Sequence, residues 1–422
     1  MREQEISRTA MEFAAHMGLD WADEKHAVCM ESADGSFQED FELAQKADAI
    51  HAWVAELRQR FSGQRVAIAI EQAKGALIHA LMMYEFIVIY PINPKALAKY
   101  REALTVSGSK DDPSDARLLK DFFKKHRDQL RAWVPDDVQT RTIQILSQHR
   151  RNAVEDRVRL MHRIESLLKA YFPQALDWAG GLHTVQACDF LQQWPTLSDV
   201  QKVRPATLRK FYYSHRCRSR KRIDERLTAI QHARPLTEDL AIVRGLSLAM
   251  KAAVAQLRPL IDVIDEFDRQ LADVFAEHPD HEIFESLPGA GAVFAPRLAA
   301  VMGADRSRFE DPSEIQRSSG IAPVTVKSGK SCWVHHRWAC PKFMKQTFHE
   351  FAELSIPYSS WARACYKLLR KRGMGHHAAV RVLAYKWIRI IFRCWKKRKP
   401  YDEAQYLETL RRRGSPVVEF LC

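Results

Sequence analysis

The sequence predicts an α/β domain at the N-terminus followed by a mostly helical remainder, and three observations support this prediction. Over the first 125 residues, short β-rich runs alternate with segments of helical apolar spacing, the pattern of an α/β layer fold. From about His126 to His281 the chain changes to long helical stretches with few glycines. Beyond residue 282 a glycine-rich element precedes further segments of helical spacing.

Within the first domain, two β-rich runs at residues 26–31 and 37–43 are expected to pair as a hairpin. The turn dipeptide Asp34-Gly35 separates them. The rest of the domain is expected to alternate, with helices over 47–61, 73–84, 94–104 and 115–123 and strands over 65–70 and 86–90.

The middle of the chain contains two long charged segments of helical spacing, residues 136–172 and 238–275. They are long enough for a coiled coil or helical hairpin, and ordinary bundle helices are the alternative. Between them, residues 202–222 hold nine Lys or Arg, no acids and several aromatic residues, which favours a nucleic-acid contact over a solvated loop. The candidate contact residues are Arg209, Lys210, Tyr212, Arg216 and Arg218.

The C-terminal part opens with Leu287-Pro288-Gly289-Ala290-Gly291 ahead of a helical run. Glycines before a helix let backbone N–H groups approach a phosphate, as in a helix-hairpin-helix element, although the motif alone is weak. Further on, apolar residues from Val380 to Trp395 recur at helical spacing and predict one buried face, so the tryptophans there are expected in the core. The expected domains are residues 1–125, 126–281 and 282–400, with a tail at 401–422.

Composition excludes several classes of protein. With 46% hydrophobic and 28% charged residues the chain is neither disordered nor a membrane protein, and its apolar runs are too short to cross a bilayer. The N-terminal residues lack the apolar segment of a signal peptide, so a cytoplasmic location is expected. The eight cysteines include no CxxC pair, which predicts reduced thiols and no structural zinc.

The positive charge is concentrated in one segment. The chain carries a net charge of +13, yet residues 317–399 alone hold nineteen Lys or Arg against two acids, while residues 1–125 hold sixteen against twenty. Such segregation costs self-repulsion, which a polyanionic partner would offset. A nucleic-acid partner is therefore favoured over a merely basic surface.

Four carboxylates of the first domain stand where a metal site would need them. Asp20 lies near a first strand, Glu71 follows an apolar strand, and Asp112 and Asp115 stand three apart at the start of a helix. Carboxylates in such positions can converge on one sheet edge and bind hard divalent cations that activate a nucleophile at phosphorus. The alternatives are structural: a helix N-cap at Asp112, a solvated charge at Glu71 and a turn at Asp20.

A second candidate site is the segment from Ser318 to Ser331, in which Ser328 lies beside Lys327, Gly329 and Lys330. A hydroxyl on flexible backbone next to cations could attack phosphorus, with the lysines stabilising the phosphoryl oxygens. From the residues alone, a phosphate-contacting loop is the simpler interpretation, with Arg337 as a further contact.

Taken in order and at these intervals, the motifs resemble those of the DEDD-type transposases of insertion sequences, which include bridge-RNA-guided serine recombinases. The resemblance covers nearly the whole chain. It is carried by Gly18-Leu19-Asp20-Trp21, Ile70-Glu71, Lys110-x-Asp112-Pro113-x-Asp115-Ala116, Leu287-Pro288-Gly289-x-Gly291 and Gly320-Ile321-Ala322-Pro323-Val324-Thr325 leading to Ser328-Gly329-Lys330.

The resemblance implies a ribonuclease-H-like domain similar to the RuvC Holliday-junction resolvase, with Mg²⁺ (or Mn²⁺) on Asp20, Glu71, Asp112 and Asp115. It also implies a coiled-coil insertion used in assembly and a mostly α-helical transposase domain with a nucleophilic serine, best matched by Ser328. Many relatives place two glycines after that serine. Here Lys330 follows Gly329, so Ser331 is a second candidate.

The expected function is therefore that of a transposase that cuts and rejoins DNA at element ends and target. It is expected to use a structured guide RNA, to act as a homo-oligomer (dimer or tetramer) and to associate with the nucleoid. Two alternatives stay open: a metal-only junction nuclease in which water attacks, and a nucleic-acid-binding scaffold without catalysis.

Overall fold

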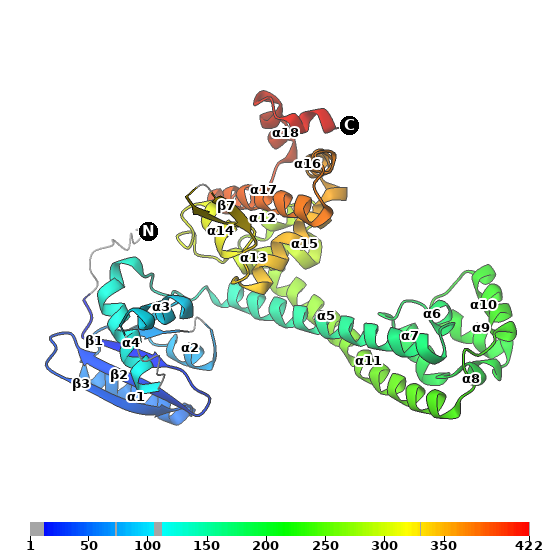
Figure 1. Cartoon of the computed structure of the whole chain (residues 1–422), viewed down its shortest axis with the longest axis horizontal. Coiled ribbons are helices and arrows are strands. Elements are labelled where there is room, and N and C mark those ends of the chain that lie inside the picture. Colours follow the sequence, from blue (N-terminus) through cyan, green and yellow to red (C-terminus); the bar gives the residue numbers. More distant parts are fainter. Residues whose placement is uncertain (1–11, 72–73, 105–111, 330, 422) are drawn as a thin grey trace. The chain divides into compact units, whose positions relative to one another are not determined.

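The computed structural model describes residues 12–71, 74–104, 112–329 and 331–421. The chain divides into two compact units, Met1–Pro135 and Asp136–Cys422 (Figure 1). Each unit has its own buried apolar core.

The first unit is built on a five-stranded mixed sheet in the order β3-β2-β1-β4-β5. β1 pairs antiparallel with β2 and parallel with β4. Strand β4 is buried at every residue, because an interior parallel strand is covered on both faces. The strands are β1 (Ala15–Asp20), β2 (Lys25–Ser32), β3 (Gln38–Ala44), β4 (Val66–Ile70) and β5 (Ile87–Pro91).

Helices cover both faces of this sheet, and each face has a separate core cluster. One cluster includes Trp53 of α1 and Leu77 of α2, and the other includes Leu97 of α3 and Phe123 of α4. The helices are α1 (Ala47–Arg60), α2 (Ala76–Leu81), α3 (Pro94–Leu104) and α4 (Asp112–His126), followed by the short η1 (Arg127–Gln129). The predicted α/β layers, including the hairpin at Asp34-Gly35, are confirmed.

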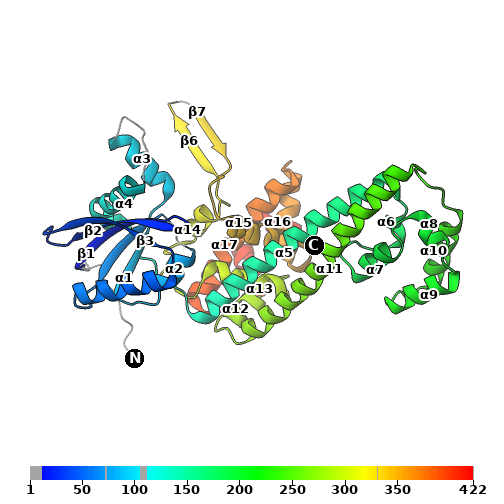
Figure 2. The same ribbon diagram turned by 90° about the horizontal axis from the view of Figure 1, so that it is seen from below.

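The second unit is organised around two long helices that run side by side, α5 (Val138–Tyr171) and α11 (Leu240–Ala276) (Figures 1 and 2). The start of α5 shares one core with the end of α11, and the end of α5 shares another with α11's first half, so the pair is antiparallel. Helix α11 is long and apolar enough to cross a membrane by length and composition alone. Its buried residues pack against α5 and its neighbours, and 22% of its most apolar 18-residue stretch is buried in the structure.

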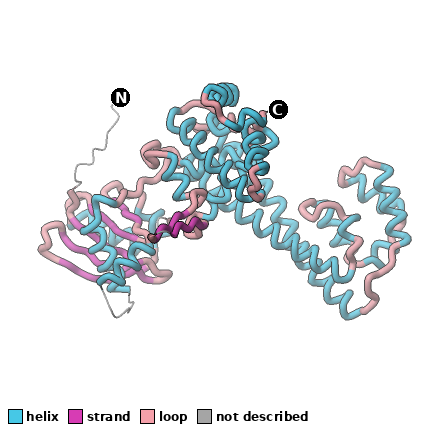
Figure 3. The backbone as a smooth tube through the Cα atoms, turned by 45° about the horizontal axis from the view of Figure 1, so that its top comes forward, coloured by secondary structure: helices cyan, strands magenta, loops and turns pink. Residues whose placement is uncertain are grey.

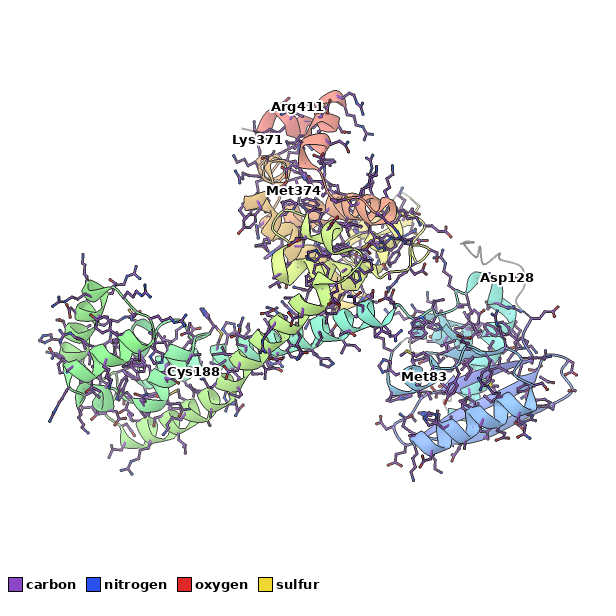
Figure 4. All side chains as sticks on the ribbon, turned by 180° about the vertical axis from the view of Figure 1, so that it is seen from behind. Met83, Asp128, Cys188, Lys371, Met374 and Arg411 are labelled. Atoms are coloured by element: carbon purple, nitrogen blue, oxygen red, sulfur yellow. The ribbon has the colours of Figure 1, made fainter. Side chains whose placement is uncertain are left out.

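A small lobe of five helices stands at one end of this pair. Cys188, labelled in Figure 4, lies in its core with Phe190 and Tyr212. The lobe helices are α6 (Ala175–Trp178), α7 (Val185–Gln193), α8 (Leu197–Gln201), α9 (Pro205–Ser214) and α10 (Arg220–His232).

The other end of the pair packs into the C-terminal bundle. The predicted apolar face of α17 is confirmed, since its residues from Val380 to Trp395 at that spacing are buried. The bundle contains α12 (His281–Glu285), α13 (Gly291–Met302), α14 (Pro312–Ser318), α15 (Lys342–Tyr358), α16 (Ser360–Lys371), α17 (His376–Lys397), α18 (Glu403–Arg412) and η2 (Pro416–Phe420).

One element of the C-terminal part differs from the prediction. The segment expected as a phosphate-contacting loop forms a β-hairpin of β6 (Val324–Ser328) and β7 (Ser331–His335), drawn in magenta in Figure 3. The physical reason is local: β-branched and aromatic residues flank a two-residue turn that begins with a glycine.

Candidate active site and nucleic-acid interface

The start of α4 is pressed directly against β1 at Gly18. A Cβ atom on Gly18 would lie 1.8 Å from the carbonyl oxygen of Ala116 and 2.6 Å from the amide nitrogen of Lys120, so only glycine fits. Side chains alternate along a strand, and Asp20 therefore lies on the same face of the sheet as Gly18. This contact brings Asp20, at the carboxyl end of β1, to the side of the sheet that α4 covers.

Glu71 lies at the same edge and on the same side. Gly18 pairs with Ala69 and Leu19 with Ile70, so Asp20 and Glu71 are the next residues of two neighbouring parallel strands. Ala69 belongs to the core cluster shared with α4, and Glu71, two residues on, follows on that side. Both carboxylates are half-buried.

Asp115 on the first turns of α4 is 3% exposed and forms an ion pair with Arg101 of α3. Asp112 is the first residue of α4, and its side chain lies outside the described residues. Sequence reasoning did not identify Arg101, because nothing in the sequence marks which of the domain's cations would face the carboxylates.

These carboxylates fit a divalent cation in their chemistry, because carboxylate oxygens suit a hard metal ion. Among the described side chains, no group of three or more acids, histidines or cysteines lies close enough to hold one. The Arg101 guanidinium balances the negative charge of the buried Asp115 carboxylate. A bound metal ion would therefore compete with Arg101 for Asp115.

Ser328 and Ser331 lie opposite each other at the turn end of the β6–β7 hairpin, and both are exposed. Gly329 has φ = +55°, a left-handed conformation that favours glycine. Lys327 is exposed, whereas Lys330 lies outside the described residues. Figure 2 shows the hairpin projecting from the helices around it.

The base of the hairpin is anchored to the bundle. The Arg381 side chain of α17 lies 3.2 Å from Nε2 of His336, the residue after β7. A Cβ on Gly320 would lie 2.4 Å from Sγ of Cys340, so the chain segments entering and leaving the hairpin are closely packed. Arg337, a predicted phosphate contact, is half-buried in this base.

The two predicted phosphate-binding glycines have different environments. Gly289 has φ = +81°, and a Cβ there would lie 2.8 Å from the Tyr358 ring and 3.1 Å from the Leu354 carbonyl oxygen. The close packing against α15 is therefore sufficient to explain why position 289 is a glycine. Gly291, the first residue of α13, has φ = +49° and open space where a Cβ would be. The space beside Gly291 is therefore open, whereas that beside Gly289 is filled by α15.

The basic segment of the lobe has an exposed charged surface. Arg209, Lys210, Arg216 and Arg218 are all exposed, and Arg209 pairs with Asp224 at 2.9 Å. Tyr212 is buried instead: its hydroxyl donates to the carbonyl of Trp178 at 3.1 Å. The expectation that Tyr212 stacks on a nucleic-acid base therefore does not fit its position.

The neighbouring Tyr213 is the aromatic residue that the lobe exposes. Helical periodicity could have separated the two tyrosines, since Leu208 and Tyr212 are four apart on one face of α9.

Sequence reasoning also missed a buried charge network that joins α5 to the bundle. Arg297 of α13 is 3% exposed, and its Nη1 donates to Glu350 of α15 at 2.9 Å. Arg151 of α5 reaches the same carboxylate at 3.0 Å. Burial lowers the pKa of Arg297, while Glu350 favours its charged form. The sequence contains one indication of this network, because Glu350 and Glu353 are the only acids between residues 317 and 399.

Two family models match the chain. Residues 17–173 match the model of the DEDD transposases of the IS110 type, described as a transposase. Residues 281–367 match the transposase IS116/IS110/IS902 family. Residues 174–280, which include the five-helix lobe, lie outside both matches.

Known relatives agree with these matches. The chain is 29% identical to the "Mini-circle putative transposase for IS117" of Streptomyces coelicolor over 393 residues, covering 92% of this chain and 95% of that protein. It is 25% identical over 299 residues to the "Insertion element IS116 uncharacterized 44.8 kDa protein" of Streptomyces clavuligerus, covering 70% and 73%. It is 24% identical over 310 residues to the "Insertion element IS900 uncharacterized 42 kDa protein" of Mycobacterium paratuberculosis, also covering 70% and 73%.

A DEDD transposase domain implies a ribonuclease-H-like fold, with which the mixed five-stranded sheet of the first unit agrees. The second family match covers the β6–β7 hairpin and most of the helices around it. The chain therefore belongs to the IS110-type family of DEDD transposases.

Proposed function

We propose that this transposase cuts and rejoins DNA through a covalent phosphoserine intermediate, with Ser328 as the nucleophile. The observation that carries the proposal is the position of Ser328 at the exposed turn end of a hairpin whose base is anchored to the bundle. A nucleophile for a polymeric substrate must reach a backbone phosphate, and an exposed hydroxyl beside Lys327 meets that need.

The proposed step exchanges one phosphoester bond for another. The Ser328 Oγ forms a new bond to phosphorus and loses its proton as the bond from phosphorus to a deoxyribose oxygen breaks, and the freed sugar oxygen takes up a proton in turn. Attack by a sugar hydroxyl of another strand reverses the step and releases the serine. Rejoining in this way needs no external energy source. Lys327 stabilises negative charge on the phosphoryl oxygens.

The carboxylates of the first unit are proposed to bind Mg²⁺, with Mn²⁺ as a substitute. Asp20, Glu71, Asp112 and Asp115 would hold the ion, which when bound supplies positive charge for phosphate oxygens. Before it binds, Arg101 balances the charge of Asp115. The family match supports a divalent metal ion, and its identity is part of the proposal.

A transposase binds DNA, and we propose in addition that this protein binds a guide RNA and associates with copies of itself. The guide RNA rests on the family resemblance and on the segregated positive charge of the chain. A homo-oligomer is supported by three large apolar side chains that stand exposed within the first three turns of α11: Leu240, Ile242 and Leu248. We further propose that the protein acts in the cytoplasm at the nucleoid.

A second candidate function is a metal-only nuclease in which water attacks and Ser328 merely contacts phosphate. The match to a DEDD family model favours it, because such a carboxylate set suggests metal-dependent hydrolysis. A non-catalytic scaffold is the third possibility.

A suicide substrate with a strand break beside the crossover separates the three functions. A serine recombinase accumulates a covalent protein–DNA adduct, because the strand needed for rejoining has diffused away. A metal-only nuclease releases free DNA ends without an adduct, and a scaffold leaves the DNA intact. Only the first result supports the proposal.

A further inference from the structure

The β6–β7 hairpin has two chemically different faces. Ser328 pairs with Ser331, Val326 with Trp333 and Val324 with His335, and side chains of directly paired residues lie on the same face. One face of the hairpin therefore carries both serines together with Val326, Trp333 and His335. We call this the serine face.

Trp333 makes the serine face unusual for a protein surface. Its side chain is 67% exposed, and its ring centroid lies 4.8 Å from that of His335, with the two planes tilted by 42°. Val326, its cross-strand partner, is also exposed. A two-stranded hairpin is only marginally stable by itself in water. A packed tryptophan side chain buries about 150–250 Å² of surface, and the exposed Trp333 lacks most of this stabilisation. Such a face is expected to be covered by a partner.

The charge of the segment around the hairpin indicates what kind of partner covers the serine face. Between Glu314 and Glu350 the sequence contains six Lys or Arg and no acid. This segment attracts phosphate and repels cationic surfaces. A partner that is both anionic and able to cover an indole ring is a nucleic-acid strand with an accessible base, because every base has a π-face.

We propose that Trp333, supported by His335, stacks on an unpaired DNA base next to the phosphate that is cut. Trp333 is two residues from Ser331 along β7, about 7 Å at the usual strand rise, so a nucleotide held on the indole can present its phosphate to the serines. Trp333 is then a positioning residue. Base stacking on Trp333 does not depend on the proposed function. The statement that the neighbouring phosphate is the one attacked by Ser328 rests on it.

The test uses the full-length protein and two DNA substrates that carry 2-aminopurine, one at an unpaired position in a gap and one within intact duplex. Trp333→Ala should weaken binding of the gapped DNA by roughly 5- to 100-fold and abolish quenching of the 2-aminopurine, with duplex affinity unchanged. Trp333→Phe should retain most of the effect, because a smaller aromatic ring still stacks.

Trp338→Ala is the matched control, because Trp338 is 82% exposed but lies outside the hairpin strands. It should bind both substrates like the unmodified protein. The proposal is overturned if Trp333→Ala keeps its preference for gapped DNA, loses affinity for both substrates equally or changes the oligomeric state. Ser328→Ala should keep the quenching, so a failure of the serine chemistry remains distinguishable.

Discussion

Gly18 and Ala116 meet so closely that a methyl group on Gly18 would lie 1.8 Å from the Ala116 carbonyl oxygen. Gly18→Ala is therefore expected to push α4 away from β1 and to lower the free energy of unfolding by about 1–3 kcal/mol. It should also reduce strand cleavage, because Asp112 and Asp115 move with α4. Thermal unfolding and a cleavage assay measure the two effects.

Gly245→Ala is the control, since Gly245 lies in α11 and nothing stands within 4 Å of a Cβ there. It should be neutral or slightly stabilising, by up to about 1 kcal/mol. Equal behaviour of the two variants would show that α4 does not depend on the contact at Gly18.

The carboxylate site predicts a loss of activity without unfolding. Asp20→Asn, Glu71→Gln and Asp112→Asn should each abolish recombination in Mg²⁺, because an amide is a poor ligand for a hard cation at nearly unchanged volume. Asp23→Asn, an exposed position three residues after Asp20, should remain active. Near-normal recombination by any of the first three variants, with an unchanged melting temperature, would remove that residue from the site.

The network at Glu350 predicts a purely structural effect. Glu350→Gln leaves the buried Arg297 without its carboxylate and should destabilise the second unit by about 2–4 kcal/mol. Glu353→Gln, one turn away on α15, breaks only an exposed contact with His376 and should cost less than about 1 kcal/mol. Denaturant unfolding of the two variants compares them directly, and equal midpoints would contradict the role assigned to Glu350.

The lobe predicts a change in salt dependence. Replacing Lys210, Arg216 and Arg218 by Gln should weaken duplex DNA binding and reduce the slope of log K against log salt by up to about 0.9 for each lost phosphate contact. Arg159→Gln with Lys169→Gln is the control, because these exposed cations on α5 already pair with Asp156 and Glu165. An unchanged slope in the lobe variant would exclude this surface from DNA binding.

Periodicity and turn chemistry were enough to predict the first unit, because strands such as β4 and turns such as Asp34-Gly35 have strong local signals. The hairpin at 324–335 was missed because its strands are only five residues long and largely exposed, so that the short alternation of Val324 and Val326 with polar residues gives a weak signal. Arg101 shows a different limit, because its ion pair with Asp115 depends on how α3 and α4 pack, which composition does not identify. The burial of Tyr212, in contrast, follows from the helical spacing of α9.

The most direct test of the central claim is to map the covalent adduct. The protein is trapped on a suicide substrate, denatured, trimmed with nuclease and analysed by mass spectrometry. A nucleotide on Ser328 is predicted. Ser328→Ala should fold and bind DNA normally but form no adduct, because Lys327 is no nucleophile while protonated, whereas Ser331→Ala should retain at least part of the activity. An adduct mapped to Ser331 or to a tyrosine, or strand cleavage without any adduct, would contradict the account.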